Sequence, residues 1–600
     1  MKSRSHFHSK LIPNCPFAWV KPQSLWAHLA TGRQSLLNSS ALEPRVSTPQ
    51  KAHFDGRRIF PLPLLVVMAV SFLVIVPFFF LGNPSGHDFE FHVNSWMEVL
   101  GQWKQGIVYP RWAALSQYGY GEARFIFYPP ASWTLGAALG ALLPWKAVPG
   151  AYVWLALTFS GCSMYLLARR WLPRRDAIFA AAFYAANPYF IIIVYWRSAF
   201  AELLAAALMP LLLLSVLRLG EENVGAVPTL ALIVSAAWLT NIPTAVMANY
   251  SLALLLLILA TLKRSPRILF RGALAVCLGA ALAAFFLLPA MHEQRWVNIA
   301  EVLSPGVRPQ DNFLFVKLDD VDHNRFNLLV SIVAFSEIIL LALAAYFSRR
   351  WRSRQPRVWW TLLGWSSFAA LLSFSFTLWF WEHLPELRYV QLPWRWLLCL
   401  NVALALLITL ASRRWIIRLL LCLAMLATIA YSWRRIQPPW WETSADIREM
   451  LEHQHSGAGY EGTDEYVPLA ADPYEIKQDA RRVALVDDEP TNQIQQLQIQ
   501  QWNAESKMFT VVLPHPGQLV LRLFNYPAWH VEVNGQPVAT STREVTGQML
   551  IPAEAGENGV RIVFTRSWDR TLGGIISLVA ALLFVTFVAL RRKRTIANPA

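Results

Sequence analysis

Apolar stretches of about 20 residues recur along the chain and are separated by short polar segments. This is the length that an α-helix needs to cross the hydrocarbon core of a bilayer. The pattern predicts an α-helical polytopic membrane protein with about twelve transmembrane helices. The predicted crossings are residues 59–81, 151–168, 177–195, 202–218, 226–241, 244–262, 268–290, 326–347, 357–379, 395–411, 415–433 and 571–590.

One more apolar segment, residues 131–144, is shorter and contains Gly136, Gly140 and Pro144. Its length and its helix-breaking residues predict a re-entrant or interfacial helix. A full crossing there would reverse the predicted sidedness of every later loop.

Residues 434–570 follow a different pattern. The runs at 518–523 and 531–533 alternate apolar and polar side chains, which is typical of strands. Asn534 and Gly535 form a strong hairpin turn signal directly after the second run. Further strands are predicted at 506–513, 547–552 and 558–565. We therefore expect an extracytoplasmic β-sandwich held between two membrane helices.

These patterns predict five regions. They are a basic cytoplasmic tail without fixed structure at 1–58, a multi-pass membrane domain at 59–433 with a large first outer loop at 82–130, the β-sandwich domain at 434–570, a final transmembrane helix at 571–590 and a second basic tail at 591–600.

Composition agrees with a membrane protein, because 55% of residues are hydrophobic and only 15% are charged. The net charge of +15 does not indicate nucleic-acid binding, since Lys and Arg lie in short clusters between apolar runs. These clusters fall on one side of the twelve-crossing arrangement, so that side and both termini are predicted to be cytoplasmic. Residues 434–570 hold 19 acidic against 12 basic residues and lie on the other side. The five cysteines show neither zinc spacing nor a disulfide framework.

The first outer loop has the densest candidate chemistry. His87, Asp88, Glu90 and His92 fall within six residues directly after the first helix. Ionisable groups beside a bilayer are costly unless they are exposed or paired, which favours a functional role over a merely solvated loop. An extended backbone would place Asp88, Glu90 and His92 on one face, whereas a helix would align Asp88 with His92. A carboxylate there could act as a general base, or the group could hold a divalent metal.

Other outer segments add arginines and further polar groups. Arg111 lies beside aromatic residues and is a candidate for binding phosphate. Arg197 and Glu202 flank a tight turn, where they either pair with each other or complete a site with the first loop. Arg388 and Arg395 lie on the outer side against the usual charge bias, which favours either a lipid phosphate or an ion pair with a nearby glutamate. The sequence contains no Walker-type, dinucleotide or nucleophile-elbow motif.

The motif Gly-His-Asp-Phe-Glu-Phe-His at 86–92 resembles a family of bacterial multi-pass membrane proteins labelled 6-pyruvoyl-tetrahydropterin synthase-related. The chain is also similar to the YfhO family. The resemblance spans about 60–594 and includes the runs Tyr-Pro-Arg-Trp at 109–112, Phe-Tyr-Pro-Pro at 127–130, Gln-Leu-Pro-Trp-Arg at 391–395 and the segment 526–535. Asn241 departs from the histidine expected in its turn. The label does not imply pterin chemistry, because nothing in the chain supplies that enzyme's zinc-binding histidine cluster.

The architecture is further similar to the GT-C superfamily of membrane glycosyltransferases, which use lipid-phosphate-linked sugars and place an acidic residue in the first outer loop. The resemblance implies a glycosyltransferase in the bacterial inner membrane that modifies an envelope glycan or glycolipid on the extracytoplasmic face. Asp88 would be the catalytic base, with Glu90 as the second candidate. The expected substrate-binding residues are His87, His92, Arg111, Arg197, Glu202, Arg388, Gln391 and Arg395.

The expected partners are a lipid-phosphate sugar donor and membrane lipid, without nucleic acid. A divalent metal held by Asp88, Glu90 and His92 is one option for a cofactor. Two other functions stay open. A lipid or polysaccharide transporter would need polar groups near the bilayer midplane, where the sequence offers mainly Asn187 and Glu337. A non-catalytic envelope assembly protein would use the sandwich to recruit partners.

Overall fold

A computed structural model describes residues 61–221, 225–435, 440–486 and 493–597, with side chains described as far as residue 590. Contacts divide the chain into Met1–Arg57 and Arg58–Ala600, and every described residue belongs to the second unit. The tail predicted at 1–58 therefore lies outside the described residues.

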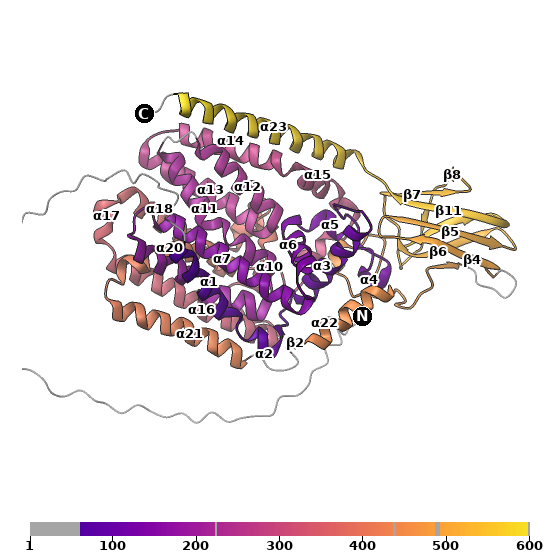
Figure 1. Ribbon diagram of the computed structural model, residues 1–600, viewed down its shortest axis with the longest axis horizontal. Coiled ribbons are helices and arrows are strands. Elements are labelled where there is room, and N and C mark those ends of the chain that lie inside the picture. The colour runs from indigo at the N-terminus through magenta and orange to yellow at the C-terminus, as the bar shows by residue number, and fades with distance from the viewer. Residues whose placement is uncertain (1–60, 222–224, 436–439, 487–492, 598–600) are drawn as a thin grey trace, which may run out of the picture. The chain divides into compact units, whose positions relative to one another are not determined.

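Apolar helices make up most of the described structure (Figure 1). Nine helical segments in these ranges are long and apolar enough to cross a membrane, and two bent pairs raise the number to eleven if each pair is one crossing. The nine contain α1 (Pro61–Ile75) with α2 (Phe78–Leu81), α7 (Val148–Ala168), α8 (Arg174–Ala185) with α9 (Pro188–Ile192) and η2 (Ile193–Arg197), α10 (Phe200–Ala205) with α11 (Leu208–Gly220), α13 (Ile242–Lys263), α16 (Val321–Phe347), η8 (Pro393–Trp396) with α20 (Leu397–Ala411), α21 (Trp415–Arg435), and α23 (Trp568–Ala597).

The crossing predicted at 226–241 is the short helix α12 (Ala226–Thr240). Its 15 residues extend about 22 Å at 1.5 Å per residue, less than the roughly 30 Å of a hydrocarbon core. The helix ends where the Asn241 side chain accepts hydrogen bonds from the next helix, including one of 3.0 Å from the Thr244 amide. The described residues thus contain nine candidate spans, or eleven if each bent pair is one crossing, beside the shorter α12, in line with the predicted polytopic fold of about twelve helices. In addition, α23 continues to Ala597, seven residues beyond its predicted end.

The bent pairs are α14 (Arg267–Leu282) with α15 (Ala284–Glu293), and α18 (Pro356–Leu371) with α19 (Leu378–His383). The first pair bends by 76°, and helix α23 packs against the break. The Phe285 amide at the break donates a 2.9 Å hydrogen bond to Ser577 Oγ of α23. Gly573 permits this approach, because a Cβ atom there would lie 2.5 Å from the Ala284 carbonyl oxygen.

The segment predicted as the first outer loop, together with the apolar segment that follows it, folds into four helices, α3 (Phe89–Lys104), α4 (Ser116–Gly119), α5 (Arg124–Phe127) and α6 (Pro130–Leu142). Helix α6 covers most of the apolar segment 131–144 and has only 13 residues. It packs against α3 and α7 and is too short for a crossing of about 20 residues. Its length agrees with the re-entrant or interfacial helix expected from the sequence.

Two antiparallel sheets pack face to face in the C-terminal region. One sheet has the order β3-β6-β10-β9 and the other β4-β5-β11-β7-β8. The strands are β3 (Val483–Leu485), β4 (Gln496–Trp502), β5 (Ser506–Leu513), β6 (Gly517–Phe524), β7 (Trp529–Val533), β8 (Gln536–Pro537), β9 (Ser541–Thr542), β10 (Gln548–Ala553) and β11 (Gly556–Phe564). Alternate side chains of both sheets form one apolar core, as the period-two pattern predicts. The predicted polytopic fold with a C-terminal β-sandwich is confirmed.

The predicted hairpin is also confirmed. Val533 pairs with Gln536 across the turn. Asn534 and Gly535 have φ values of 52° and 76°, the left-handed conformation that a two-residue hairpin turn requires.

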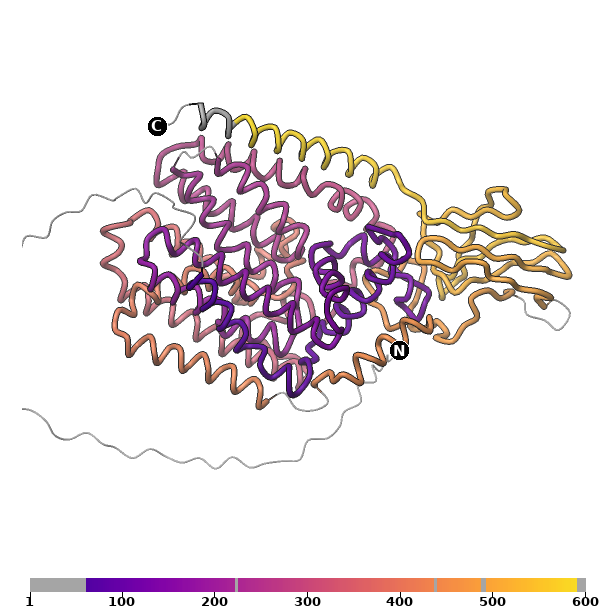
Figure 2. The backbone as a smooth tube through the Cα atoms, viewed as in Figure 1, coloured from indigo at the N-terminus to yellow at the C-terminus, as the bar shows by residue number. Residues whose placement is uncertain are grey.

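The first outer loop joins the sandwich, although the two are far apart in the sequence (Figure 2). Trp112 is fully buried in the sandwich core, with its ring centroid 5.6 Å from that of Trp529. The Phe524 amide donates a 3.0 Å hydrogen bond to the Tyr120 carbonyl oxygen. A two-stranded sheet of β1 (Asn83–Pro84) and β2 (Trp441–Glu442) adds another connection. The loop therefore occupies a fixed position between the helices and the sheets.

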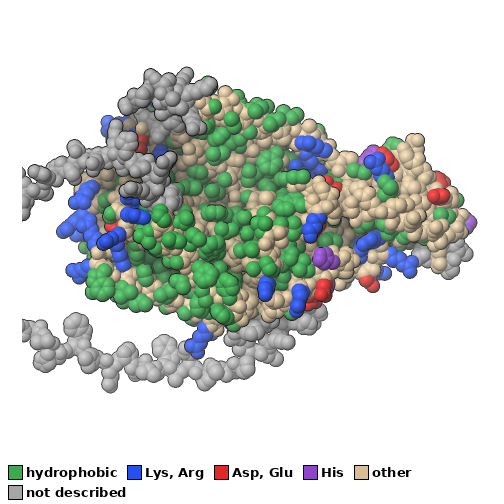
Figure 3. All heavy atoms as spheres, in the orientation of Figure 1, with side chains coloured by type: hydrophobic (Ala, Val, Ile, Leu, Met, Phe, Trp, Pro, Cys, Tyr) green, Lys and Arg blue, Asp and Glu red, His purple; other side chains and the backbone are tan. Residues whose placement is uncertain are grey.

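Lys and Arg side chains gather at the end of the helices where α17 (Arg350–Arg354) lies (Figures 1 and 3). A broad hydrophobic surface covers the middle of the helices (Figure 3). The sandwich is at the opposite end (Figure 1). This is the separation of charge that the positive-inside rule describes.

A buried ion pair fixes α23 to α15 and to the sandwich. Arg570 donates from Nε and Nη2 to the two carboxylate oxygens of Glu293, both at 2.7 Å. Tyr526 OH donates to the same carboxylate at 2.7 Å. The side chains of Arg570 and Glu293 are 3% and 0% exposed, respectively. If one partner were lost, water could not solvate the remaining charge.

We expect Arg570→Met to lower the free energy of unfolding by about 3–5 kcal/mol, because Glu293 would become a buried, unpaired charge. Unfolding of the purified protein in detergent measures this change. The control is Arg561→Met, which removes an exposed partner of Glu532 and should cost less than about 1 kcal/mol. Equal unfolding of the two variants would contradict the structural role of the buried pair.

Candidate active site

Glu202 lies at the centre of a buried cluster. Arg197 Nη1 is 2.5 Å and Arg395 Nε is 3.0 Å from the same oxygen, Glu202 Oε2. Tyr189 OH donates to the other oxygen at 2.5 Å. The three charged side chains are 1–9% exposed. Arg197 and Glu202 therefore pair with each other, which is one of the two predicted alternatives, and Arg197 also contacts Asp88 of the first loop.

The turn after η2 brings the first loop to this cluster. Helix η2 is a π-helix, a feature that often occurs at functional sites, and it ends at Ser198 in the left-handed conformation with φ 51°. The Gly86 amide donates to Ser198 Oγ at 3.0 Å, and the Asp88 amide donates to the Arg197 carbonyl oxygen at 2.9 Å. A Cβ atom on Gly86 would lie 2.4 Å from the Arg197 carbonyl carbon, so only glycine allows this approach.

Asp88 is the accessible carboxylate of the cluster. Its Oδ2 lies 3.7 Å from Arg197 Nη2, and its side chain is 41% exposed. Because Asp88 directly precedes α3, its backbone is held while its carboxylate remains open to solvent. A carboxylate in this position can accept a proton from a hydroxyl group while a neighbouring guanidinium stabilises negative charge.

Arg395 is oriented by the chain just before it. Its Nη1 donates to the Val390 carbonyl oxygen at 2.6 Å and to Gln391 Oε1 at 3.0 Å. Gln391 has a positive φ of 64° and donates from its side chain to the Val302 carbonyl oxygen at 2.7 Å. Gln391 is held in a strained backbone conformation, and its side chain orients the guanidinium of Arg395. Gln391 is therefore a positioning residue.

The two histidines differ in their surroundings. His87 is exposed and contacts the Phe326 ring edge-on, with centroids 5.3 Å apart. His92 is buried among the rings of Phe200 and Tyr128, 5.2 and 5.8 Å away. Burial lowers the pKa of His92 to about 4, Asp88 opposes this shift, and nearby arginines add to it. His92 is therefore neutral at pH 7.

Three predicted site residues lie apart from the Glu202 cluster. Arg111 stacks over the Tyr109 ring at 4.3 Å, and its amide donates to Glu505 of the sandwich. Arg388 is exposed and contacts the hydroxyl of neighbouring Tyr389 at 3.3 Å; among the described ion pairs it has none with a glutamate. Glu90 is exposed, and partial burial and the charge of Glu461 raise its pKa. Among the described contacts, no hydrogen bond joins Arg111 or Arg388 to Arg395, and their predicted phosphate binding stays a prediction.

The metal site considered for Asp88, Glu90 and His92 is also corrected. Within the described ranges, no three His, Cys, Asp or Glu side chains are placed to hold a metal ion. The aromatic rings around His92 and the exposure of Glu90 explain why these three do not converge.

A second polar group supports the cluster from within the membrane helices. Glu337 accepts hydrogen bonds from the Tyr189 amide at 3.3 Å and from Asn401 Nδ2 at 2.9 Å. Asn401 also donates to Asn187, which caps α9. These intramembrane polar side chains are bonded to one another and to the segment that holds Tyr189.

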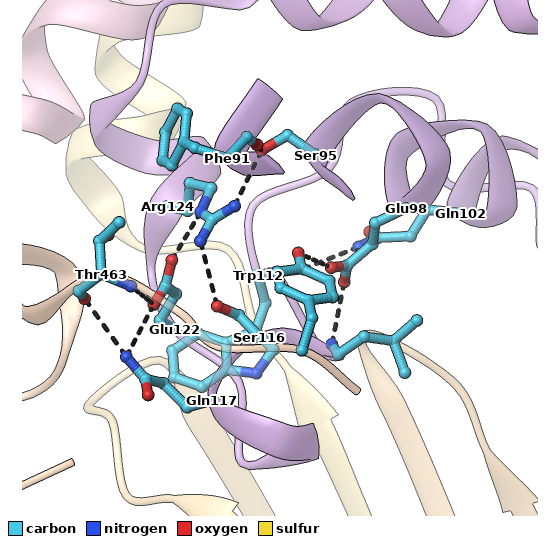
Figure 4. A network of polar contacts seen from close by, with 12 residues as sticks. Phe91, Ser95, Glu98, Gln102, Trp112, Ser116, Gln117, Glu122, Arg124 and Thr463 are labelled. Carbon is cyan, nitrogen blue, oxygen red and sulfur yellow. Dashed lines mark hydrogen bonds and ion pairs between the residues drawn. The ribbon is translucent and has the colours of Figure 1, made fainter. Parts of the chain in front are cut away.

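Sequence reasoning missed a separate network inside the first loop (Figure 4). Arg124 Nε is 2.6 Å from Glu122 Oε1, and Arg124 also donates to Ser95 and Ser116. Further along α3, Glu98 accepts hydrogen bonds from Gln102 and from the hydroxyl of Tyr460. Only the nearness of Glu122 to Arg124 in the sequence could have indicated this network.

The buried His92 predicts a pH dependence of stability. The folded protein binds fewer protons than the unfolded chain between pH 6.5 and about 4, so stability should fall as pH falls through this window. The expected slope from this group is about 1.4 kcal/mol per pH unit. Unfolding measured across the window should show a smaller slope for His92→Phe. An unchanged slope in His92→Phe would contradict the prediction.

Solved structures show a distant similarity to this chain. ArnT from Cupriavidus metallidurans bound to undecaprenyl phosphate has a TM-score of 0.42 and 15% identity, covering 66% of this chain and 78% of ArnT. ArnT from the same organism in the apo state has a TM-score of 0.29 and 13% identity, covering 58% of this chain and 76% of ArnT. The Archaeoglobus fulgidus oligosaccharyltransferase in complex with zinc and sulfate has a TM-score of 0.32 and 12% identity, covering 67% of this chain and 54% of the oligosaccharyltransferase. TM-scores below 0.5 assign no function to this chain.

No curated protein matches the sequence. The family model described as "6-pyruvoyl-tetrahydropterin synthase related domain; membrane protein" matches residues 125–438, more than half of the chain. The matched range is narrower than the predicted 60–594: it contains Arg197, Glu202 and Arg395 but begins after Asp88. The chain belongs to this 6-pyruvoyl-tetrahydropterin synthase-related family of membrane proteins.

Proposed function

We propose that this protein is a glycosyltransferase of the bacterial inner membrane that uses a polyprenyl-phosphate-linked sugar on the extracytoplasmic face. The main observation behind the proposal is the half-exposed Asp88 carboxylate. It lies 3.7 Å from the guanidinium of Arg197, which is buried and paired with Glu202. An open base beside fixed positive charge suits the transfer of a sugar from a phosphate to a hydroxyl group.

In the proposed reaction, Asp88 accepts the proton of the acceptor hydroxyl. The acceptor oxygen forms a bond to the anomeric carbon, and the bond from that carbon to the phosphate oxygen breaks. The lipid phosphate leaves with the electron pair. Arg197 and Arg395 together carry two positive charges against the single buried charge of Glu202, so the cluster favours the developing phosphate charge.

An apolar cavity of about 600 Å³ beside β1 supports a lipid-linked donor. It opens among α1, α2 and α7, and α2 ends directly before the first loop. Its lining includes Phe72, Phe78, Phe79, Trp154 and Lys146. Aromatic and aliphatic side chains suit a polyprenyl chain, and the lining also holds one cation, Lys146, and one carboxylate, Glu442.

The proposed orientation follows from the separation of charge. The basic clusters at the α17 end would face the cytoplasm, and the sandwich and Asp88 would face outward. Both termini are then proposed to be cytoplasmic.

A transporter finds less support. Transport sites need polar groups that face a cavity near the midplane. Both carboxylate oxygens of Glu337 are instead bonded to Tyr189 and Asn401. The non-catalytic assembly protein is separated from the enzyme by the experiment on Asp88.

We expect Asp88→Asn to lower the yield of glycosylated product by about 100-fold or more, since a positioned general base contributes about 10²–10⁴ in rate. Envelope glycans and lipids from cells expressing each variant in place of wild type are compared by mass spectrometry for the loss of one sugar mass. Glu90→Gln is the matched control, because Glu90 is exposed two residues away and should retain most of the yield.

A wild-type yield from Asp88→Asn would remove Asp88 from the reaction. If removal of the whole protein changes envelope assembly while every outer-loop acid variant behaves as wild type, the assembly function is favoured over the enzyme.

A further inference from the structure

A polar cavity of about 350 Å³ lies between α3, helix α22 (Ser444–Ser456) and the sandwich. None of the residues around Glu202 line it. The volume is at the lower end of the range for small-molecule sites. We propose that this cavity binds a saccharide residue that carries a phosphate or carboxylate group. This site goes beyond the proposed transfer reaction and does not depend on Asp88.

Two adjacent guanidiniums provide the anion-binding side. Arg522 Nη2 donates to the Gly457 carbonyl oxygen at 3.0 Å, whereas its buried Nε has no partner among the described residues. A Cβ atom on Gly457 would lie 3.1 Å from Arg482 Nη2, so both guanidiniums lie close to the same glycine. Burial, and next the charge of Arg482, lower the pKa of Arg522. Neither arginine forms an ion pair with a described carboxylate. Two like charges without a counterion favour an anion between them.

The surrounding charge supports the same conclusion. Residues 434–570 hold more acidic than basic side chains, yet the part of this region that lines the cavity contributes Arg482 and Arg522 and no carboxylate. The single acid of the lining is Glu98. Its two oxygens already accept hydrogen bonds from Gln102, Leu115 and Tyr460, and burial raises its pKa. Repulsion of an anionic ligand by Glu98 is therefore weak.

An aromatic ring and one unpartnered amide oxygen suit the sugar itself. The Arg482 guanidinium lies over the half-buried Trp502 ring, 5.7 Å from its centroid, and both residues line the cavity. Sugar rings present an apolar C–H face that packs on such a surface. Gln102 lies beside Glu98 (Figure 4), is 1% exposed and has a buried Oε1 without a described partner. A sugar hydroxyl can donate to this oxygen, which otherwise loses hydrogen-bonding energy.

The test measures binding to the full-length protein in nanodiscs of zwitterionic lipid by isothermal titration calorimetry. The probes are glucose 6-phosphate, glucuronate, glucose and inorganic phosphate. We expect glucose 6-phosphate or glucuronate to bind more tightly than glucose and phosphate, and the better of the two identifies the anionic group. The double variant Arg482→Gln/Arg522→Gln should weaken this binding by about tenfold or more, because it removes two charge-assisted hydrogen-bond donors.

Two controls locate the site. Arg561→Gln removes an exposed arginine of the other sheet and should bind as wild type. Asp88→Asn should also bind as wild type, and a loss there would move the site to the Glu202 cluster and overturn the proposal. Unfolding temperatures confirm that each variant is folded, and Trp502→Leu tests the aromatic surface separately. The proposal is also overturned if neither acidic sugar binds, if phosphate alone binds as tightly, or if the double variant retains wild-type affinity.

Discussion

The arrangement of the outer segments depends on the buried carboxylate of Glu202. A carboxylate at 1% exposure is costly unless it is paired, and here two guanidiniums and a tyrosine hydroxyl satisfy it. Its partners come from η2, from η8 and from α9, so one charge connects three helical segments. The turn at Arg197 also holds the backbone of Asp88, whose amide donates a hydrogen bond to the Arg197 carbonyl oxygen. The position of the proposed base therefore follows from the pairing of an acid more than 100 residues away.

Regular local patterns made most of the fold predictable. The alternation of side chains and the Asn534–Gly535 turn predicted the main strands and the hairpin, because both depend on neighbouring residues only. Hydropathy located the membrane helices, but it predicted a full crossing at the short helix α12. The apolar sequence of α12 continues into α13 across the break at Asn241. Composition marks apolar character but not where a polar side chain caps the next helix.

The candidate site was predictable only in part. Charge on the outer side indicated Asp88, Arg197, Glu202 and Arg395, and these do converge. Arg111 instead lies over the Tyr109 ring, and its amide partner Glu505 is 394 residues along the chain. Spacing in the sequence shows neither such distant partners nor the aromatic surroundings of His92. The network around Arg124 was missed because its acceptors are ordinary loop residues until the sandwich packs against them.

Helix α3 sets a geometric limit on how the two proposed sites can act together. Asp88 directly precedes the helix and Gln102 lies near its other end, 14 residues later. At 1.5 Å per residue, their backbones are about 21 Å apart along the axis. A single sugar cannot contact both groups. An acceptor that places a hydroxyl at Asp88 while its anionic residue lies beside Arg522 must therefore be an extended oligosaccharide, whereas a short acceptor would leave the cavity to a separate ligand.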